Sequence, residues 1–182
     1  MLKLLSQYAK GKTVLILFLI TQLVYAIIIF VTIPKVMAFA NGMALPDMMP
    51  MGYSVDYVRD LFTKLGTEGR NTYLTQQIPL DKIYPGLFAL MYALLLTYLL
   101  KISEIKNQLW YYCAFFAIFG GFFDYLENFS IITIILSFPD IQDWMAISAS
   151  ICTLGKSIFS TFYFCVLLVV LIIFLVKKTK SS

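Results

Sequence analysis

Two carboxylates and an amide lie inside an apolar stretch of the sequence, GGFFDYLENFS, at Asp124, Glu127 and Asn128. Their spacing of i, i+3 and i+4 places the three side chains on one face of a helix. Gly120 and Gly121 lie one turn earlier on the same side, where small residues let a neighbouring helix approach closely. We therefore expect this polar face to point into a bundle of helices.

A lysine in the last apolar segment matches this polar face in depth. The third and fourth apolar segments are joined by a short turn whose centre lies near Ile141. Counted from that centre, Glu127 lies 14 residues back, Asp124 17 residues back and Lys156 15 residues forward. At about 1.5 Å per residue, Lys156 and Glu127 reach nearly the same depth in two antiparallel helices. The sequence predicts an ion pair or a hydrogen-bonded cluster between them, with Asp124 and Asn128 alongside.

Ionisable groups inside a membrane mark either a functional site or a structural contact. An unpaired charge at mid-bilayer costs about 2.5–3.5 kcal/mol on insertion scales, so such groups pair or become neutral. Two carboxylates facing one lysine leave a surplus negative charge, for which Arg70 and Lys82 are nearby cations. The predicted ligand-binding residues are Asp124, Glu127, Asn128, Lys156, Arg70, Tyr73 and Asp81. A structural role, in which the cluster fixes the register of the helices, stays open beside the functional one.

The composition indicates a membrane protein. Of the 182 residues, 60% are hydrophobic and 13% are charged, and the charged share is about half that of a soluble domain. The mean hydropathy is +0.84.

The net charge of +4 comes without a basic stripe, which argues against nucleic-acid binding. The absence of histidine removes the commonest general base and most zinc sites, so we expect neither a metal site nor a cofactor. Three cysteines in apolar runs, Cys113, Cys152 and Cys165, are expected to be buried structural thiols.

Four segments are long enough to cross a bilayer, which takes about 20 apolar residues. Backbone groups in hydrocarbon must hydrogen-bond to one another, which a helix achieves within a single segment. The predicted spans are residues 13–33, 83–100, 109–137 and 144–176. We predict an all-α fold in which these spans form one bundle and the whole chain forms one domain.

The connection between the first two spans, residues 34–82, is long enough to hold structure of its own. Ser54 has the chemistry of a helix N-cap and Gly66 that of a helix stop. The apolar residues between them that share one helical face are Val55, Val58, Leu61, Phe62 and Leu65. We predict an amphipathic extracytoplasmic helix that lies on the membrane surface or caps the bundle. Pro79 and Pro85 are expected to break or kink the start of the second span.

Basic residues near the ends of the spans predict the orientation. Lysines precede the first span, lie in the second connection and follow the last span, whereas the third connection, FPDIQD, has none. Because cytoplasmic loops carry the excess of Lys and Arg, both termini are expected in the cytoplasm. The first apolar run ends in AFA, as at a signal-peptide cleavage site. Its length of about 20 residues exceeds that of a signal peptide's apolar region, so we expect a retained span. The compact form without organelle-type signals favours a bacterial inner membrane.

Four motifs in this order resemble a known pattern: LGTEGRNTYL, LDKIYPGLFAL, GGFFDYLEN and a lysine in the last span. The pattern is similar to that of a group of small, uncharacterised bacterial four-span membrane proteins with G-R-x-x-Y, D-x-x-[FY]-P and D-x-x-E-N signatures. The resemblance covers roughly residues 52–176 and implies no activity. It implies that the following residues act as one set: Arg70, Tyr73, Asp81, Pro85, Asp124, Glu127, Asn128 and Lys156.

A more distant likeness, in architecture alone, is to the emopamil-binding and sigma-2-receptor-like proteins. These are small helical bundles whose acidic residues lie in a lipid-accessible cavity that binds sterols and amphiphilic amines. The sterol isomerases among them use a histidine, which this sequence lacks. The likeness therefore implies no isomerase activity.

Three functions remain open from the sequence. The first is binding of a small amphiphile, lipid or cation at a polar site formed by the third and fourth spans. The second is a structural or assembly subunit, in which the polar cluster fixes the helix register. The third is an intramembrane lipid-modifying enzyme that uses a carboxylate and a lysine for proton transfer. Membrane lipid is the expected partner, and a homo-oligomer is left open. An open cavity at the cluster favours the first and third functions, and a closed contact favours the second.

Overall fold

The computed structural model describes residues 2–180 and shows an all-α protein, as the sequence predicts. Met1, Ser181 and Ser182 lie outside the described residues, as does the side chain of Lys180. In chain order the helices are α1 (Leu2–Tyr8), α2 (Gly11–Ile27), α3 (Ile33–Phe39), α4 (Val55–Lys64), α5 (Gly66–Thr72), α6 (Ile78–Ile102), α7 (Gln108–Tyr112), α8 (Ala114–Ser137) and α9 (Asp143–Lys180). Three short turns accompany them: π-helical η1 (Ile28–Thr32) and η3 (Tyr73–Gln77), and 3-10 helical η2 (Pro46–Met48).

Within the described residues, four helical stretches are long and apolar enough to cross a membrane. They are Gly11–Phe39, Gly66–Ile102, Gln108–Ser137 and Asp143–Thr179. Each contains one of the predicted spans. The first two run well past the predicted ends, because the helical backbone continues into polar sequence that the hydropathy pattern excludes. Much of the connection predicted over residues 34–82 is therefore helical.

Two prolines, Pro34 and Pro79, lie inside these long helices, and a π-helical turn precedes each of them. Each proline lies two residues after the end of its turn: Thr32 ends η1 before Pro34, and Gln77 ends η3 before Pro79. The amide of Ile78 donates to the carbonyl of Tyr73, five residues back, where the hydrogen-bond register changes. Because a proline is tolerated in the first turn of a helix, α3 and α6 continue from these points. The helix that contains α6 is thus unbroken at Pro79, where the sequence predicts a break or a kink.

The predicted amphipathic helix is α4, and it caps one end of the bundle. The hydroxyl of Ser54 accepts a hydrogen bond from the amide of Tyr57, so Ser54 is its N-cap as predicted. Gly66 has a φ of +62°, a left-handed conformation that favours glycine and separates α4 from α5. Leu61 and Phe62 on the inner face of α4 are fully buried against the core, which rules out a helix lying apart on a membrane surface.

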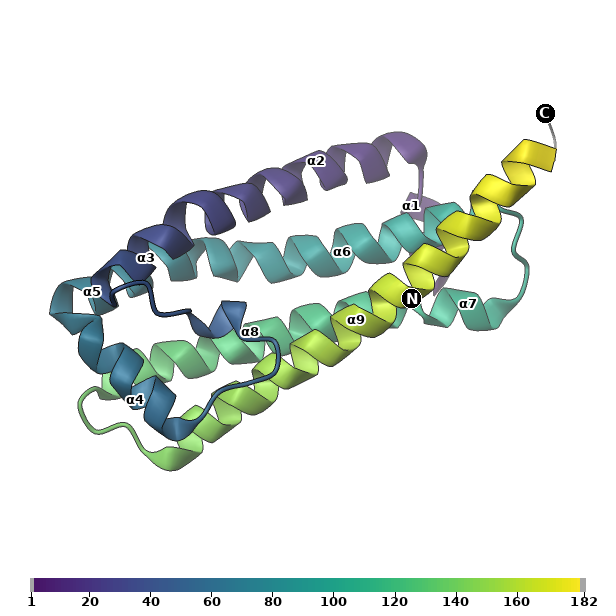
Figure 1. Ribbon diagram of the computed structural model, residues 1–182. Coiled ribbons are helices and arrows are strands. Elements are labelled where there is room, and N and C mark those ends of the chain that lie inside the picture. The colour runs from purple at the N-terminus through teal and green to yellow at the C-terminus, as the bar shows by residue number, and fades with distance from the viewer. Residues whose placement is uncertain (1, 181–182) are drawn as a thin grey trace.

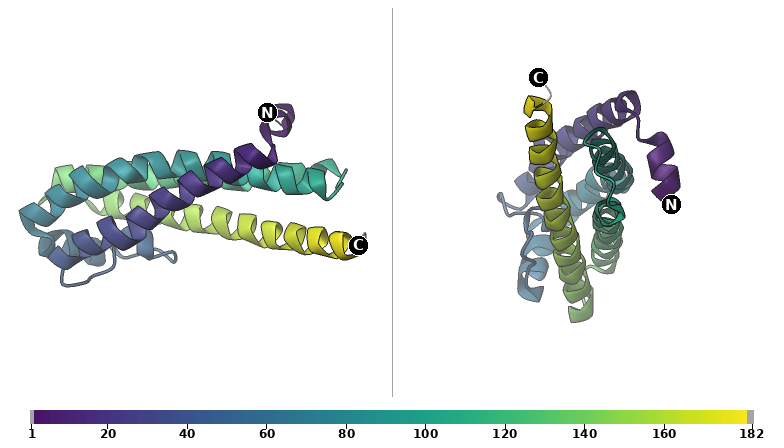
Figure 2. Two further views of the ribbon diagram at one scale, coloured as in Figure 1. Left: turned by 90° about the horizontal axis from the view of Figure 1, so that it is seen from above. Right: turned by 90° about the vertical axis from the view of Figure 1, so that its right-hand side faces the viewer.

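The long helices are arranged so that α6 and α8 form the centre. The α2 helix packs against α6, and α9 packs against α8 (Figure 1). Figure 2 shows α2 running obliquely across the others, with both chain ends at the end opposite α4 and α5. Since α2 and α9 each have their main contacts with the central pair, they are the outer members that face each other across the bundle.

Two apolar clusters stabilise the bundle, one at each end. The cluster beneath α4 contains Phe62 and Ile131, and the cluster near the chain ends contains Leu100 and Ala114. The outward faces of α2 and α9 are apolar and exposed, as suits helices that contact lipid. The cysteines differ from the prediction: Cys113 and Cys152 are half-buried and Cys165 is exposed, and of the three only Cys113 packs against the edge of a cluster, the one near the chain ends.

Candidate functional site

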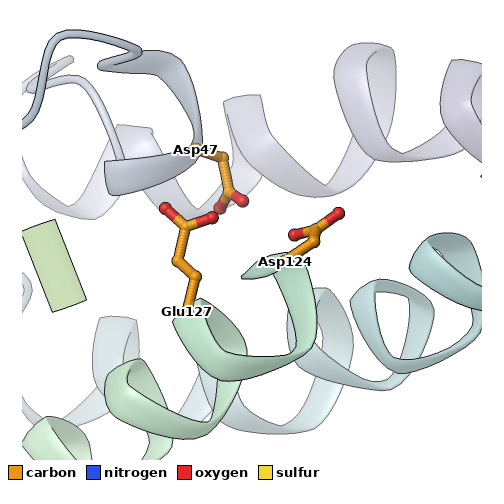
Figure 3. Close-up of side chains that lie close together, drawn as sticks. All are labelled: Asp47, Asp124 and Glu127. Carbon is orange, nitrogen blue, oxygen red and sulfur yellow. The ribbon is translucent and has the colours of Figure 1, made fainter. Parts of the chain in front are cut away.

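Lys156 of α9 is the centre of a cluster of carboxylates between the two apolar clusters. Its Nζ forms an ion pair with Oε2 of Glu127, and it lies 3.3 Å from Oδ1 of Asp124 and 3.4 Å from Oδ1 of Asp47. Figure 3 shows Asp47 reaching toward Glu127 and Asp124, which both rise from α8. One ammonium group is therefore shared by three carboxylates, one more than the helix pattern of the sequence predicts.

The additional carboxylate, Asp47, comes from the irregular chain between α3 and α4. It lies in the short η2 turn after Pro46, and its Oδ2 accepts a hydrogen bond of 3.4 Å from the hydroxyl of Tyr73. Tyr73 is fully buried and stacks on Phe62 of α4, so the cap of the bundle holds Asp47 in place. No periodic pattern marks Asp47 in the sequence, because the segment around it forms no regular helix.

Glu127 lies on the closed side of the cluster. Its side chain is 1% exposed, and its Oε1 accepts a hydrogen bond from the hydroxyl of Thr153. The hydroxyl of Tyr53 lies 3.2 Å from that of Thr153. Burial, with the negative charge of Glu127 nearby, raises the pKa of Tyr53, so its hydroxyl stays protonated and can donate a hydrogen bond. The surroundings of Glu127 are therefore filled by protein groups, which is the arrangement expected of a structural contact.

Asp81 of α6 is held by a second hydrogen-bonded chain. Nε2 of Gln77 donates to Oδ2 of Asp81 over 2.7 Å, and Oε1 of Gln77 accepts a hydrogen bond from the hydroxyl of Thr32. Thr32 ends η1 and Gln77 ends η3, so the two π-helical turns meet at this point. Neither Thr32 nor Gln77 is predicted from the sequence, because π-helical turns have no periodic signature of their own.

Asn128 donates a hydrogen bond to a backbone carbonyl that Pro85 leaves without a partner in its own helix. A proline inside a helix cannot donate to the carbonyl four residues earlier, so the carbonyl of Asp81 is left without its helical partner. Nδ2 of Asn128 donates to this carbonyl over 2.9 Å. In an apolar interior an unsatisfied carbonyl is costly, so Asn128 compensates for Pro85 across the contact between α6 and α8.

We expect Asn128→Leu to destabilise the protein by about 1–3 kcal/mol, the cost of an unsatisfied buried polar group. The cost should shrink in a Pro85→Ala background, where residue 85 regains an amide that can donate to the carbonyl of Asp81. Thermal unfolding of the two single variants and the double variant in detergent measures this coupling. Equal costs of Asn128→Leu in both backgrounds would show that Asn128 does not serve this carbonyl.

Arg70 and Lys82 do not join the cluster. Arg70 donates to the carbonyl of Phe62 over 2.8 Å, and its guanidinium lies 3.7 Å above the ring of Phe138. It thereby ties α5 to α4 and to the loop between α8 and α9. The side chain of Lys82 is exposed. Neither of these candidate cations contacts the carboxylates. Within residues 2–180, Lys156 is therefore the only basic residue of the cluster.

A cavity of about 400 Å³ lies beside the cluster, a size that suits a small ligand. Its acidic end is lined by Asp47, Asp81, Asp124 and Lys156. Aromatic and aliphatic side chains line much of the rest, among them Ile29, Tyr84, Phe88, Tyr92 and Phe164. Along α9 the lining extends from Lys156 to Phe164, which is about 12 Å at the helical rise. The cavity is therefore elongated, polar at one end and largely apolar toward the other.

The cavity opens sideways between α2 and α9. Tyr25 of α2 and Phe164 of α9 line it from opposite sides, and each is 43% exposed. Gln22 lines it as well and donates to the hydroxyl of Tyr92 over 3.4 Å. Gln22 and Tyr25, which lie three residues apart on one face of α2, thus both face the interior of the bundle.

The predicted ligand-binding residues fall into three groups. Asp81, Asp124 and Lys156 line the cavity. Tyr73, Glu127 and Asn128 lie behind them as supports, and Arg70 lies apart at the cap. The chain matches no protein-family model, no curated protein and no solved structure. The geometry of this site is therefore the basis for a functional proposal.

Proposed function

We propose that this chain is an integral membrane protein that binds a small, positively charged amphiphile in the cavity between α2 and α9. The observation that carries the proposal is the pairing of an acidic end with an aromatic and aliphatic wall in one laterally open cavity. The proposed orientation places both termini in the cytoplasm of a bacterial cell, with the acidic end nearer the extracytoplasmic side.

The acidic end holds more carboxyl groups than basic groups among the described residues. Three carboxylates share the ammonium group of Lys156, those of Asp47, Asp124 and Glu127, and a fourth, that of Asp81, lines the same end of the cavity. Charges in an apolar surrounding require neutralisation by protons or by a cation. An anionic head, such as a phosphate or a carboxylate, would meet repulsion here, because Lys156 is already shared by three carboxylates.

Two carboxylate oxygens are free to accept a ligand. One oxygen of Asp81 binds Gln77, and one oxygen of Asp124 lies 3.3 Å from Lys156. The second oxygens, Oδ1 of Asp81 and Oδ2 of Asp124, have no hydrogen-bond donor within residues 2–180. Both residues line the cavity and are buried. A ligand with a positively charged N–H group would satisfy both oxygens.

The wall of the cavity suits the rest of such a ligand. The ring centroids of Phe88 and Tyr92 lie 4.6 Å apart, and those of Tyr92 and Phe164 lie 5.2 Å apart. The three rings therefore form one continuous aromatic surface. The stacked rings of Tyr25 and Tyr84, 5.4 Å apart, lie beside it. Ring faces attract cations as well as apolar chains. An apolar tail can pack on this surface and leave between α2 and α9 into lipid.

The proposal is tested by binding of dodecylamine to the detergent-solubilised chain, with dodecan-1-ol as the uncharged comparison. We expect the amine to bind the wild type and to bind Asp124→Asn and Asp81→Asn roughly ten to a hundred times more weakly. A charge-assisted hydrogen bond contributes about 1.5–3 kcal/mol, which corresponds to this range.

The matched control is Asp60→Asn, the same substitution in an exposed pair with Lys64 on α4, far from the cavity. It should leave amine binding unchanged. Equal binding of the amine and the alcohol by the wild type, or an undiminished affinity in Asp124→Asn, would contradict the proposed function.

A further inference from the structure

Two half-buried serines and one exposed threonine on α9 line the cavity without a hydrogen-bond partner for their side chains among the described residues. In apolar helices, Ser and Thr side chains commonly donate to the carbonyl four residues earlier. This chain follows that pattern at Thr21, Thr97, Ser130, Thr133 and Ser148. Ser157, Ser160 and Thr161 line the cavity, and none of the three makes a side-chain hydrogen bond to any described residue.

These hydroxyls are placed next to the acidic end. They follow Lys156 by one, four and five residues on one face of α9, which puts them roughly 2–8 Å further along the helix axis. Gly120 of α8 lies close against this section of α9: a Cβ there would lie 3.1 Å from Oγ of Ser160. The polar groups that line the cavity thus extend along α9 over a greater length than one ammonium group would occupy.

We infer that the cavity recognises an amino-alcohol amphiphile, whose head carries a positively charged N–H group and at least one hydroxyl group on a neighbouring carbon. The ammonium group meets Asp81 and Asp124, and the ligand hydroxyl meets Ser157 and Ser160, with Thr161 beside them. This inference rests on the proposed function and names the ligand class of the same site. A simple alkyl amine would leave the three hydroxyls unsatisfied, which lowers its affinity.

The test compares dodecylamine with 1-aminododecan-2-ol, which adds one hydroxyl group to the same chain on the carbon next to the amine-bearing one. Both are titrated against the full chain in maltoside detergent and measured by native mass spectrometry. We expect the amino alcohol to bind the wild type roughly tenfold more tightly, which one additional hydrogen bond of about 1.4 kcal/mol provides. The triple variant Ser157→Ala, Ser160→Ala, Thr161→Val should lose this preference while still binding dodecylamine.

A matched triple variant controls for the loss of hydroxyl groups as such. Ser130→Ala, Thr133→Val and Ser148→Ala remove two serines and one threonine whose hydroxyls donate to the backbone. This variant should keep the tenfold preference. Equal binding of the two probes by the wild type would overturn the inference and leave the proposed function standing. Failure of both probes to bind would overturn the proposed function as well. The wild-type comparison decides these outcomes even if a variant does not fold.

Discussion

Replacement of Lys156 by Met is expected to be among the most damaging single changes in this chain. It leaves Asp47, Asp124 and Glu127 around a site without a cation, and breaking a buried ion pair in this way costs about 3–5 kcal/mol. For a chain of this size, about 2–4 °C of thermal stability is lost per kcal/mol, so the unfolding temperature should fall by roughly 6–20 °C. Thermal unfolding in detergent provides the measurement.

Two further variants show whether the loss comes from unpaired charge. Lys64→Met removes a lysine from an exposed pair with Asp60 on α4, and it should cost at most about 1 kcal/mol. Glu127→Gln should recover part of the stability lost in Lys156→Met, because it removes one of the unpaired carboxylates. If Glu127→Gln and Lys156→Met destabilise the protein additively, the two side chains are not coupled and the interpretation of the cluster is wrong.

Gly121→Ala is expected to separate α6 from α8. A Cβ at this position would lie 2.6 Å from the carbonyl oxygen of Pro85 and 3.0 Å from Cβ of Ala89. Neither group can turn away, because one is backbone and the other is fixed to it. We expect a loss of about 1–3 kcal/mol, typical of overpacking, together with weaker ligand binding. Asp81 and Asp124 lie on these two helices and would move apart.

Gly120→Ala is the matched comparison, one residue earlier on the same helix. Its Cβ would meet Oγ of Ser160 at 3.1 Å and a ring carbon of Phe88 at 3.5 Å, and the serine hydroxyl can rotate. Both substitutions gain the same helix propensity, about 1 kcal/mol, so the difference between them isolates the close approach of α6. Similar unfolding temperatures for the two variants would show that α6 and α8 are not in the tight contact described.

The sequence by itself determined the helical content and the helices that can span a membrane. Long apolar runs leave a backbone in hydrocarbon no other way to satisfy its hydrogen bonds, so the fold class follows from composition. The same holds for α4, whose N-cap and apolar face are local features. The residues of the cluster on α8 and α9 were also visible, because helical periodicity and depth can be counted along the chain.

Only the tertiary structure decided which of these polar residues face open space. Glu127 and Asp124 are one turn apart on α8, yet Glu127 is enclosed by Thr153 and Lys156, whereas Asp124 lines the cavity. Whether each carboxylate is enclosed or lines the cavity depends on its distance from α9 and from the cap. The spacing of residues along α8 does not give that distance. The assignment of Asn128 to the carbonyl left free by Pro85 likewise depends on the approach of two helices.

The contribution of Asp47 and Gln77 could not be predicted for a related reason. Asp47 reaches the site from an irregular segment, and Gln77 does so because a π-helical turn shifts the phase of the helix. Periodic patterns predict residues only where the backbone repeats regularly. The sequence therefore fixes which segments become helices, while the cavity between α2 and α9 exists because the fold packs each of them mainly against α6 or α8.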